Sequence, residues 1–384
     1  MERHSIDHDR TGDGAGAALA DHIRLAQVVL PCRDLNATLA FFTGRLGFKV
    51  NLIFPADSPS TAVVSGHGLT LRLEVADIVA APITLRLLCD LASLPAGTPH
   101  LLTAPDGTRV ELVEARRAIE VPEGTREFVL SRMSDDWGIG RAGMQYRDLV
   151  PSRLGGRFIA SHIRIPVGGP VPDYVHFHRI RFQMIYCRKG WARLVYEDQG
   201  APFLFQAGDC VLQPPEIRHR VLEASDGLEV IEIGCPALHE TFADHAMTLP
   251  TPHVLPQRDF GGQRFVRHVA AEARWLLWRP QGSEAGFEAR DTGIGAATDG
   301  LAGARVVRPR GGAGARATLG AHGGELLFLF VLAGELRLEG ATLGDHRLRE
   351  GDSCVIPADA AHAIEAGAGS EILEVTLPAE LPHA

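Results

Sequence analysis

Two segments of this chain, about 145 residues apart, repeat one pattern of glycine, proline and histidine. Segment 208–219 begins with Gly-Asp, has a proline six residues later and ends in His219, and segment 351–362 does the same and ends in His362. A repeat of this length is too long for a solenoid and predicts a duplicated domain. Short apolar runs between glycine and proline turns fill both copies, which indicates β-strands. We therefore expect a mainly β chain.

Two more histidines lie upstream of the first copy, in the run His176-Phe177-His178. On a strand, side chains two residues apart point to the same face. Together with His219, which returns after a hairpin, they would bring three imidazoles to one place. Such a set suits a transition metal such as Fe, Mn, Ni, Cu or Zn. The sequence therefore predicts a metal site.

These residues resemble the two sequence motifs of the cupin superfamily, and the two copies together resemble a bicupin. One motif has two histidines one residue apart, then Glu, then Gly, and the other has Gly, then Pro, then His. In this chain the motifs read His176, His178, Gln183, Gly190 and Gly208, Pro214, His219. The resemblance implies two tandem double-stranded β-helix barrels. It also implies one divalent metal ion in the first, with Fe(II) favoured over Mn, Ni or Zn and with Gln183 in place of a carboxylate ligand.

The second copy keeps half of this ligand set. His322 and His362 remain, while Gly320 and Leu327 occupy the other two positions. Two histidines are too few for a tight closed metal site. We expect the second barrel to be metal-free and to have a structural role.

The segment before the repeat predicts a small α+β domain. It opens with an apolar strand, continues with a helix capped by Asp34 and ended by Gly47, and goes on to three strands. This βαβββ order resembles one module of the vicinal-oxygen-chelate (glyoxalase/bleomycin-resistance) superfamily. The residues that carry the resemblance are Leu30-Pro31-Cys32-Arg33-Asp34-Leu35, Phe41-Phe42, Leu46-Gly47-Phe48 and the run 105–114.

In that family, metal ligands come from positions that match Gln27, Glu74, Thr84 and Glu111 here. Thr84 is a poor ligand and Gln27 a weak one, so we interpret this domain as metal-free. Its expected role is packing or dimerisation, or lending a wall to a substrate cavity. The expected organisation is a disordered leader 1–22, this domain 23–116, a linker 117–139, the metal-binding barrel 140–246, a linker 247–264 and the second barrel 265–384.

Composition excludes several function classes. The chain has 384 residues, a net charge of −9 and a sequence pI of about 6.0, so it lacks the basic stripe of a nucleic-acid-binding protein. No apolar stretch reaches the ~18 residues that a membrane span requires. The six cysteines lack CxxC spacing and mostly lie in apolar strands, as free thiols do in a reducing compartment. We expect a cytoplasmic protein with no nucleic-acid or membrane partner. Dimers are common for the cupin fold, so a homodimer is an open option.

Further candidate site residues follow from position along the strands. His162 and Arg164 alternate on the strand entering the first barrel, and they face either the cavity or solvent. Arg181 precedes Gln183 by two residues and either binds a substrate carboxylate with a bidentate fork or lies at the surface. Tyr174 could cap the cavity mouth. The candidate catalytic residues are Gln183, Arg181, His162, Arg164 and Tyr174.

Gln183 determines the expected chemistry. Three neutral imidazoles and a neutral amide leave a divalent ion with its full charge, so the substrate has to supply negative charge. A small anionic chelating organic molecule fits this need, and a mononuclear non-haem Fe(II) dioxygenase is the favoured function. The alternatives are a non-oxidative metal-dependent isomerase, cyclase, hydrolase or lyase, and a non-catalytic small-molecule binding protein, because one fold hosts many functions.

Overall fold

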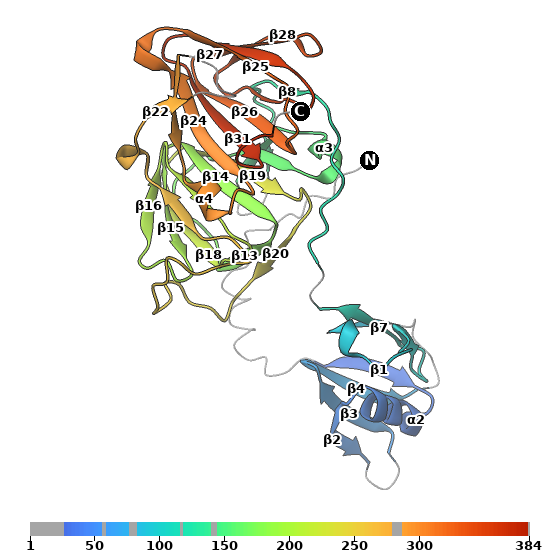
Figure 1. The fold of residues 1–384 in the computed structure, drawn as a ribbon. Coiled ribbons are helices and arrows are strands. Elements are labelled where there is room, and N and C mark those ends of the chain that lie inside the picture. Colours follow the sequence, from blue (N-terminus) through green and yellow to red (C-terminus); the bar gives the residue numbers. More distant parts are fainter. Residues whose placement is uncertain are drawn as a thin grey trace. The chain divides into compact units, whose positions relative to one another are not determined.

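The computed structural model describes residues 27–55, 59–76, 83–115, 118–139, 144–278 and 286–382. The expected leader 1–22 lies outside these residues. The chain forms two compact units, Met1–Ala118 and Ile119–Ala384. Figure 1 shows the elements of each unit, which are mainly β-strands as the sequence predicted. No helix among the described residues is long and apolar enough to cross a membrane.

Unit 1 contains two small sheets that share one apolar core. The first sheet has the order β1-β4-β3-β2, with β1 parallel to β4, and the second has the order β5-β7-β6. Leu30, Phe42 and Leu71 pack in the same core as Leu85 and Val110 from the second sheet. The strands are β1 (Val28–Cys32), β2 (Lys49–Phe54), β3 (Thr61–Gly66), β4 (Leu69–Val75), β5 (Thr84–Cys89), β6 (Leu101–Thr103) and β7 (Arg109–Glu114).

The helix of unit 1 begins where the sequence indicates. The Asp34 carboxylate accepts a hydrogen bond from the backbone N–H of Ala37 at 2.9 Å, which satisfies one of the open donors of the first turn. Helix α2 (Leu35–Ala40) continues into a π-helical turn, η1 (Phe41–Arg45). Gly47 follows with φ of 71°, a conformation that favours glycine. This gives the order βαβββ, and the likeness to the vicinal-oxygen-chelate superfamily stays a prediction.

The first barrel of unit 2 consists of a seven-stranded and a six-stranded sheet. The first has the order β21-β17-β14-β19-β11-β10-β9, and the second has the order β16-β15-β18-β13-β20, with β12 also paired to β18. The elements are β9 (Gly138–Ile139), β10 (Gln145–Asp148), α3 (Arg153–Gly156), β11 (Ile159–Ile165), β12 (Gly169–Pro170), β13 (His176–Arg179), β14 (Phe182–Lys189), β15 (Trp191–Tyr196), β16 (Phe203–Gln206), β17 (Cys210–Leu212), β18 (His219–Ala224), β19 (Leu228–Cys235), β20 (Glu240–Ala243) and β21 (Val266–His268).

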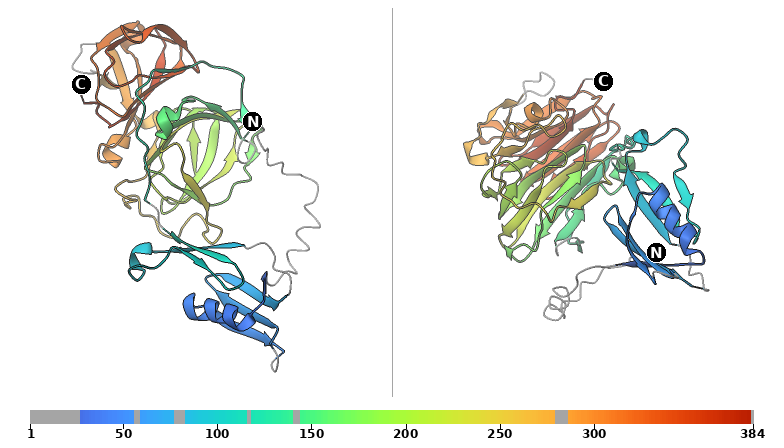
Figure 2. Two further views of the ribbon diagram at one scale, coloured as in Figure 1. Left: turned by 90° about the vertical axis from the view of Figure 1, so that its right-hand side faces the viewer. Right: turned by 90° about the horizontal axis from the view of Figure 1, so that it is seen from below.

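The second barrel repeats the plan with sheets β22-β23-β24-β31-β26-β29-β8 and β25-β30-β27-β28. Figure 2 shows it beside the first barrel within unit 2. Its elements are β8 (Val129–Ser131), β22 (Leu276–Trp278), β23 (Phe287–Asp291), α4 (Ile294–Ala297), β24 (Gly303–Pro309), β25 (Ala315–Leu319), β26 (Leu326–Ala333), β27 (Glu335–Gly340), β28 (Gly344–Arg349), β29 (Ser353–Val355), β30 (His362–Ala366) and β31 (Glu371–Leu377).

The same turn appears in both barrels. Gly190 and Gly334 follow the equivalent strands β14 and β26 with φ of 76° and 72°. A Cβ atom at Gly190 would lie 2.4 Å from the Ser225 hydroxyl, and one at Gly334 would lie 2.5 Å from the Ser370 hydroxyl. Both the positive φ and the close serine require glycine, which explains why both copies of the repeat keep it.

The two seven-stranded sheets pack against each other. Phe182 and Met184 of β14 lie in one buried cluster with Phe328 and Phe330 of β26. Side chains alternate across a strand, so Gln183 of β14 faces the other way, into the first barrel. The interface between the barrels therefore takes every second residue of these strands and leaves the others for the cavities.

Each barrel also receives an edge strand from outside its own stretch of sequence. β8 precedes the first barrel in the chain but pairs with β29 of the second barrel. β21 follows the first barrel and pairs with its strand β17. β8 thus lies in the stretch expected as linker 117–139, and β21 in the stretch expected as the second barrel.

Candidate metal centre

Three histidines converge inside the first barrel. His176 and His178 lie on β13, and His219 begins β18 directly opposite His176 in the antiparallel pair. Among the described residues, they form the one group of three or more His, Cys, Asp or Glu side chains whose ligand atoms all lie within 4.8 Å of one another. The strand alternation and the hairpin return thus bring the three imidazoles together, as the sequence predicts.

Hydrogen bonds fix the orientation of all three rings. The Nδ1 atom of His176 lies 2.8 Å from the Tyr174 carbonyl oxygen, and that of His219 lies 3.0 Å from the Ile217 carbonyl oxygen. His178 Nδ1 lies 2.9 Å from the Thr241 hydroxyl oxygen. A carbonyl can only accept, so His176 and His219 carry their proton on Nδ1 and the ring lone pair on Nε2. This is the tautomer that binds a metal through Nε2.

Gln183 lies on β14 and is 1% exposed. Its Nε2 donates a hydrogen bond to Glu232 Oε1 at 2.5 Å, and its buried Oε1 has no hydrogen-bond partner among the described residues. A buried carbonyl oxygen without a partner is costly unless an ion or a ligand supplies one. The three imidazoles therefore fit a divalent transition-metal ion as ligands. The Gln183 oxygen is a buried acceptor without a partner among the described residues, although Gln183 is not one of the residues that line the cavity.

Glu232 is a site residue that the sequence analysis missed. It lies on β19, opposite Ile185 of β14 and Ser161 of β11, and its side chain lines the same cavity as the three histidines. The barrel therefore holds a carboxylate beside Gln183, although not at the motif position. In the sequence of β19, Glu229 and Glu232 both lie among aliphatic residues. This pattern does not show which of the two side chains faces the cavity.

The cavity around the histidines has a volume of about 520 Å³. Its walls are largely aliphatic and aromatic, and its polar lining includes Asp148, Arg153 and Thr241 besides the histidines. The apolar lining includes Ile159, Ile163, Ile185, Leu194, Phe205 and Val230. A cavity of this size and composition is typical of a small-molecule site.

Two further polar residues of the cavity lie outside the motifs. His239 lies in the connection from β19 to β20, with its ring centroid 5.4 Å from that of His178. Gln213 donates from Nε2 to the Tyr196 hydroxyl at 3.0 Å, and its buried Oε1 has no partner among the described residues. The Tyr196 ring in turn stacks on His219, with centroids 5.4 Å apart.

His162 and Arg164 lie on the opposite face of β11 from the cavity. The residues of β11 that line the cavity are Ile159, Ser161, Ile163 and Ile165. Their parity places the even-numbered residues on the other side, which corrects the inward-facing alternative from the sequence. The outward, solvent-facing alternative is also wrong for His162. Its side chain is fully buried, and its ring centroid lies 5.8 Å from that of Phe330 in the second barrel.

Arg147 and Glu229 bind His162 at this interface. Arg147 Nη2 lies 3.1 Å from His162 Nδ1, and His162 Nε2 lies 2.9 Å from Glu229 Oε2. Because a guanidinium can only donate, the imidazole accepts at Nδ1 and donates from Nε2. Burial lowers the pKa of His162 most, the Glu229 hydrogen bond opposes this, and the Arg147 charge lowers the pKa further.

Arg181 is bound elsewhere. Its Nη1 and Nη2 atoms donate to Glu325 Oε2 and Oε1 at 2.8 and 3.1 Å, and Arg157 binds the same carboxylate at 2.5 Å. The predicted bidentate fork is thus present, but its carboxylate comes from the second barrel and Arg181 does not line the cavity. Tyr174 is 41% exposed and contributes its backbone oxygen to His176.

Two of the unit 1 residues that match metal-ligand positions of the vicinal-oxygen-chelate superfamily form ion pairs with arginines. Glu74 pairs with Arg72 at 2.5 Å, and Glu111 pairs with Arg86 at 3.0 Å. Gln27 lies just before β1, and Thr84 begins β5 in the other sheet. The structure therefore gives Glu74 and Glu111 a role in surface ion pairs.

The two barrels of unit 2 share one strand topology, and the first carries its histidines at the positions of the two cupin motifs. Unit 2 has the fold of a bicupin. No protein-family model and no curated protein matches the sequence.

Several solved structures resemble this chain over about two thirds of its length. An oxalate decarboxylase from Lactobacillus farciminis is 16% identical, with 68% of this chain and 89% of that chain covered and a TM-score of 0.47. A salicylate 1,2-dioxygenase from Pseudaminobacter salicylatoxidans is 14% identical, with 67% and 86% covered and a TM-score of 0.47. Protein Ylba from E. coli is 14% identical, with 68% and 94% covered and a TM-score of 0.46. At these identities the likeness concerns the fold alone.

Proposed function

We propose that the first barrel is the active site of a metal-dependent enzyme, a mononuclear non-haem Fe(II) dioxygenase acting on a small anionic chelating organic substrate. The observation that carries the proposal is the set of three oriented histidines. From the motif we infer that an amide, Gln183, takes the place of a carboxylate ligand. This set neutralises none of the charge of a divalent ion, so an anionic substrate is the natural complement. A bound ferrous ion would supply Lewis acidity and the capacity for oxygen chemistry.

The protein side chains define how a substrate would be oriented. Glu232 accepts the amide N–H of Gln183, which directs Gln183 Oε1 away from Glu232. Gln213 Oε1 and the Glu232 carboxylate are further acceptors on the cavity wall. An α-hydroxy acid, an enediol or a catechol would chelate the ion through an oxygen anion. Each of them could also donate a hydrogen bond from a hydroxyl group to an acceptor on the cavity wall.

The aliphatic walls favour a substrate with an apolar body. Ile163, Ile185 and Val230 surround the space next to the polar groups, in a cavity of about 520 Å³. Burial of apolar surface contributes roughly 25 cal/mol per Å², so a substrate with a ring or a branched chain gains more here than a two-carbon acid does.

Metal content and oxygen uptake test the proposal. Protein purified without added metal is expected to contain about one iron per chain, and His219→Ala is expected to lose it. His362→Ala changes the equivalent histidine of the second barrel and serves as the matched control, which keeps its iron. Oxygen uptake is then measured with catechol-like, enediol and β-dicarbonyl substrates. Iron-loaded protein that consumes no oxygen with any of them would contradict the dioxygenase assignment.

A non-oxidative metalloenzyme is the second candidate, and Glu232 is the observation that favours it. A carboxylate in the cavity next to the site can take or give a proton in isomerase, lyase or hydrolase chemistry. This candidate predicts Zn, Mn or Ni in the purified protein and turnover under strictly anaerobic conditions. Turnover that requires oxygen would exclude it.

A further inference from the structure

The second barrel contains a cavity of its own, of about 380 Å³. It lies on strands of the second barrel that are equivalent to those around the metal centre of the first barrel. Leu327 of β26 pairs with Thr376 of β31, as Gln183 of β14 pairs with Gly234 of β19. The cavity therefore occupies the place that the metal centre has in the other copy.

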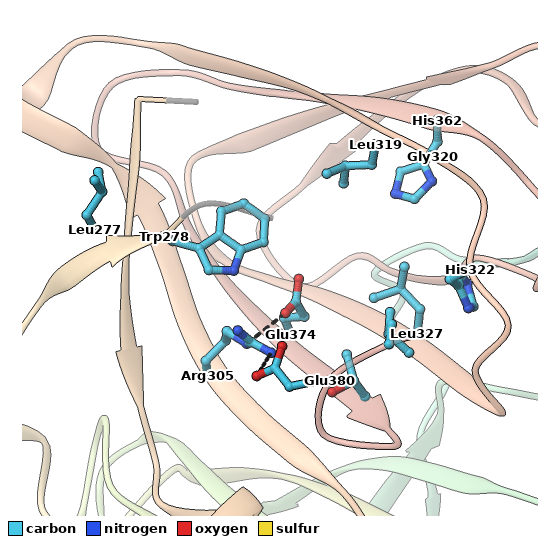
Figure 3. A pocket seen from close by; sticks show the side chains of 12 residues that line it. Leu277, Trp278, Arg305, Leu319, Gly320, His322, Leu327, His362, Glu374 and Glu380 are labelled. Carbon is cyan, nitrogen blue, oxygen red and sulfur yellow. Dashed lines mark ion pairs between the residues drawn. The ribbon is translucent and has the colours of Figure 1, made fainter. Parts of the chain in front are cut away.

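A buried ion pair replaces part of the polar set of the first barrel. Glu374 of β31 lies opposite Arg305 of β24, as Glu232 lies opposite Ser161. Arg305 Nε lies 2.9 Å from Glu374 Oε1, and the exposed Glu380 lies 3.7 Å from Arg305 Nη2 (Figure 3). The guanidinium charge thus already faces two carboxylates, so a further buried anion would find no free counterion here.

The two histidines of this cavity differ in their hydrogen bonds. His322 has both nitrogens engaged, Nε2 with the Ile356 carbonyl at 3.2 Å and Nδ1 with the Gly324 N–H at 3.2 Å. His362 Nδ1 lies 3.0 Å from the Ala360 carbonyl oxygen and must donate to it, so Nε2 carries the lone pair. That Nε2 atom is buried without a hydrogen-bond partner among the described residues, in a residue that is 4% exposed and lines the cavity.

Most of the remaining lining is aromatic or aliphatic, and the Thr376 hydroxyl in it donates to the Ala379 carbonyl oxygen. Trp278, Leu319 and Leu327 line the cavity, and Figure 3 shows the Trp278 indole and the His362 imidazole on different sides of it. An aromatic ring buries a large apolar area against such walls. A hydroxyl or N–H on that ring would meet the acceptor that His362 leaves unsatisfied.

We propose that the second barrel binds a small uncharged aromatic molecule that donates one hydrogen bond, from a hydroxyl or N–H group, to His362 Nε2. The site is independent of the metal centre and of its reaction. Metal binding is disfavoured here because His322 has no nitrogen left for an ion. A neutral ring matches the apolar part of the walls and leaves the ion pairs of Arg305 in place.

Phenol and anisole test the proposal, because anisole replaces the hydroxyl donor of phenol with a methoxy group. The full chain is labelled with 5-fluorotryptophan, which gives fluorine NMR signals for its four tryptophans. Comparison with Trp278→Phe identifies the signal of Trp278. We expect phenol to shift this signal saturably, with a Kd at least about tenfold below that of anisole, the size expected from one buried unpaired group.

Histidine variants locate the binding site. His362→Leu is expected to remove the preference for phenol, and His362→Gln, which keeps an acceptor, to retain part of it. His219→Leu makes the matched change in the first barrel and is expected to leave the Trp278 titration unchanged. Equal affinity for phenol and anisole in the wild-type protein would overturn the proposal. So would a phenol titration that is unaffected by His362→Leu but abolished by His219→Leu.

Discussion

Gln183 and Glu232 form the pair of residues on which the chemistry of the first barrel depends. The amide donates to the carboxylate at 2.5 Å, and Gln183 is almost fully buried. The Glu232 carboxylate thus lines the cavity of the three histidines and accepts from a neutral amide. It is not one of the side chains whose ligand atoms cluster within 4.8 Å, so an ion in that cluster would be held by the three imidazoles.

Gln183→Glu should destabilise the protein without metal by about 1–3 kcal/mol, because two carboxylates then share one buried site. The double variant Gln183→Glu, Glu232→Gln exchanges the two groups and should recover most of the loss. Urea denaturation in the presence of a chelator measures both effects. If the double variant is no more stable than the single one, the two side chains do not interact as the structure indicates.

His162 provides a pH-dependence at the residue scale. Its pKa is lowered from 6.5, chiefly by burial, so the unfolded chain binds its proton at a higher pH than the folded protein does. The stability that the neutral ring contributes is therefore complete above pH 6.5 and is lost as the pH falls below it. We expect the free energy of unfolding to decrease between pH 7 and pH 5.

His162→Gln should flatten this decrease, since one titrating proton contributes at most about 1.4 kcal/mol per pH unit. Urea denaturation at several pH values between 7 and 5 gives the slopes. The exposed His253 supplies a control, and His253→Gln should leave the slope as it is in the wild type. An unchanged slope in His162→Gln would show that another group dominates the pH response.

At the scale of elements, the alternation of side chains on the seven-stranded sheets separates interface from cavity. Ala160 of β11 and Phe182, Met184 and Tyr186 of β14 pack in the cluster shared with the second barrel. The odd-numbered residues of β11, and Ile185 of β14, line the first cavity. Arg181 lies in the turn just before β14 and binds Glu325 just before β26. This contact joins the start of β14 in the first barrel to the start of the equivalent strand, β26, in the second barrel.

Arg181→Met should therefore change stability rather than substrate binding. The hydrogen bonds and charge of Arg181, together with those of Arg157, lower the pKa of Glu325 to about 2 from 4.5 against the opposing effect of burial. The pair thus stabilises the protein above pH 4.5, and its contribution disappears as the pH falls toward 2. We expect a loss of about 1–2 kcal/mol at pH 7 for this partly exposed pair, with KM unchanged. A raised KM with unchanged stability would contradict this and show that Arg181 binds substrate.

At the scale of the whole molecule, unit 2 depends on a strand that precedes its first barrel. β8 pairs with β29, and next to it the Asp352 carboxylate accepts hydrogen bonds from the Met133 N–H at 2.7 Å and from Arg132 at 2.9 Å. The two barrels are thus one folding unit with interleaved edges, although the repeat in the sequence presents them as two separate copies.

Two truncations test this dependence. A chain of residues 119–384 keeps β8, whereas a chain of residues 140–384 lacks it and leaves the edge of β29 unpaired. We expect the longer chain to unfold like unit 2 of the intact protein, and the shorter one to be less stable by about 2–4 kcal/mol. Thermal and urea unfolding measure the difference. Equal stability of the two chains would show that β8 is dispensable.

The sequence by itself determined the repeat, the β architecture and the three histidines. These depend on local rules: glycine where φ is positive, and alternation along one strand for His176 and His178. The HxH spacing and the hairpin return needed no knowledge of distant residues, and the same holds for the Asp34 cap of the helix.

Only the tertiary structure decided what surrounds the site. Which face of β11 is inside depends on where the second barrel packs, so the sequence left both orientations of His162 and Arg164 open. Glu232 meets Gln183 across two paired strands, and Arg181 meets Glu325 across 144 residues of chain. Spacing along one strand determines which side chains share a face, but packing between strands and between barrels determines which face is buried and what it contacts.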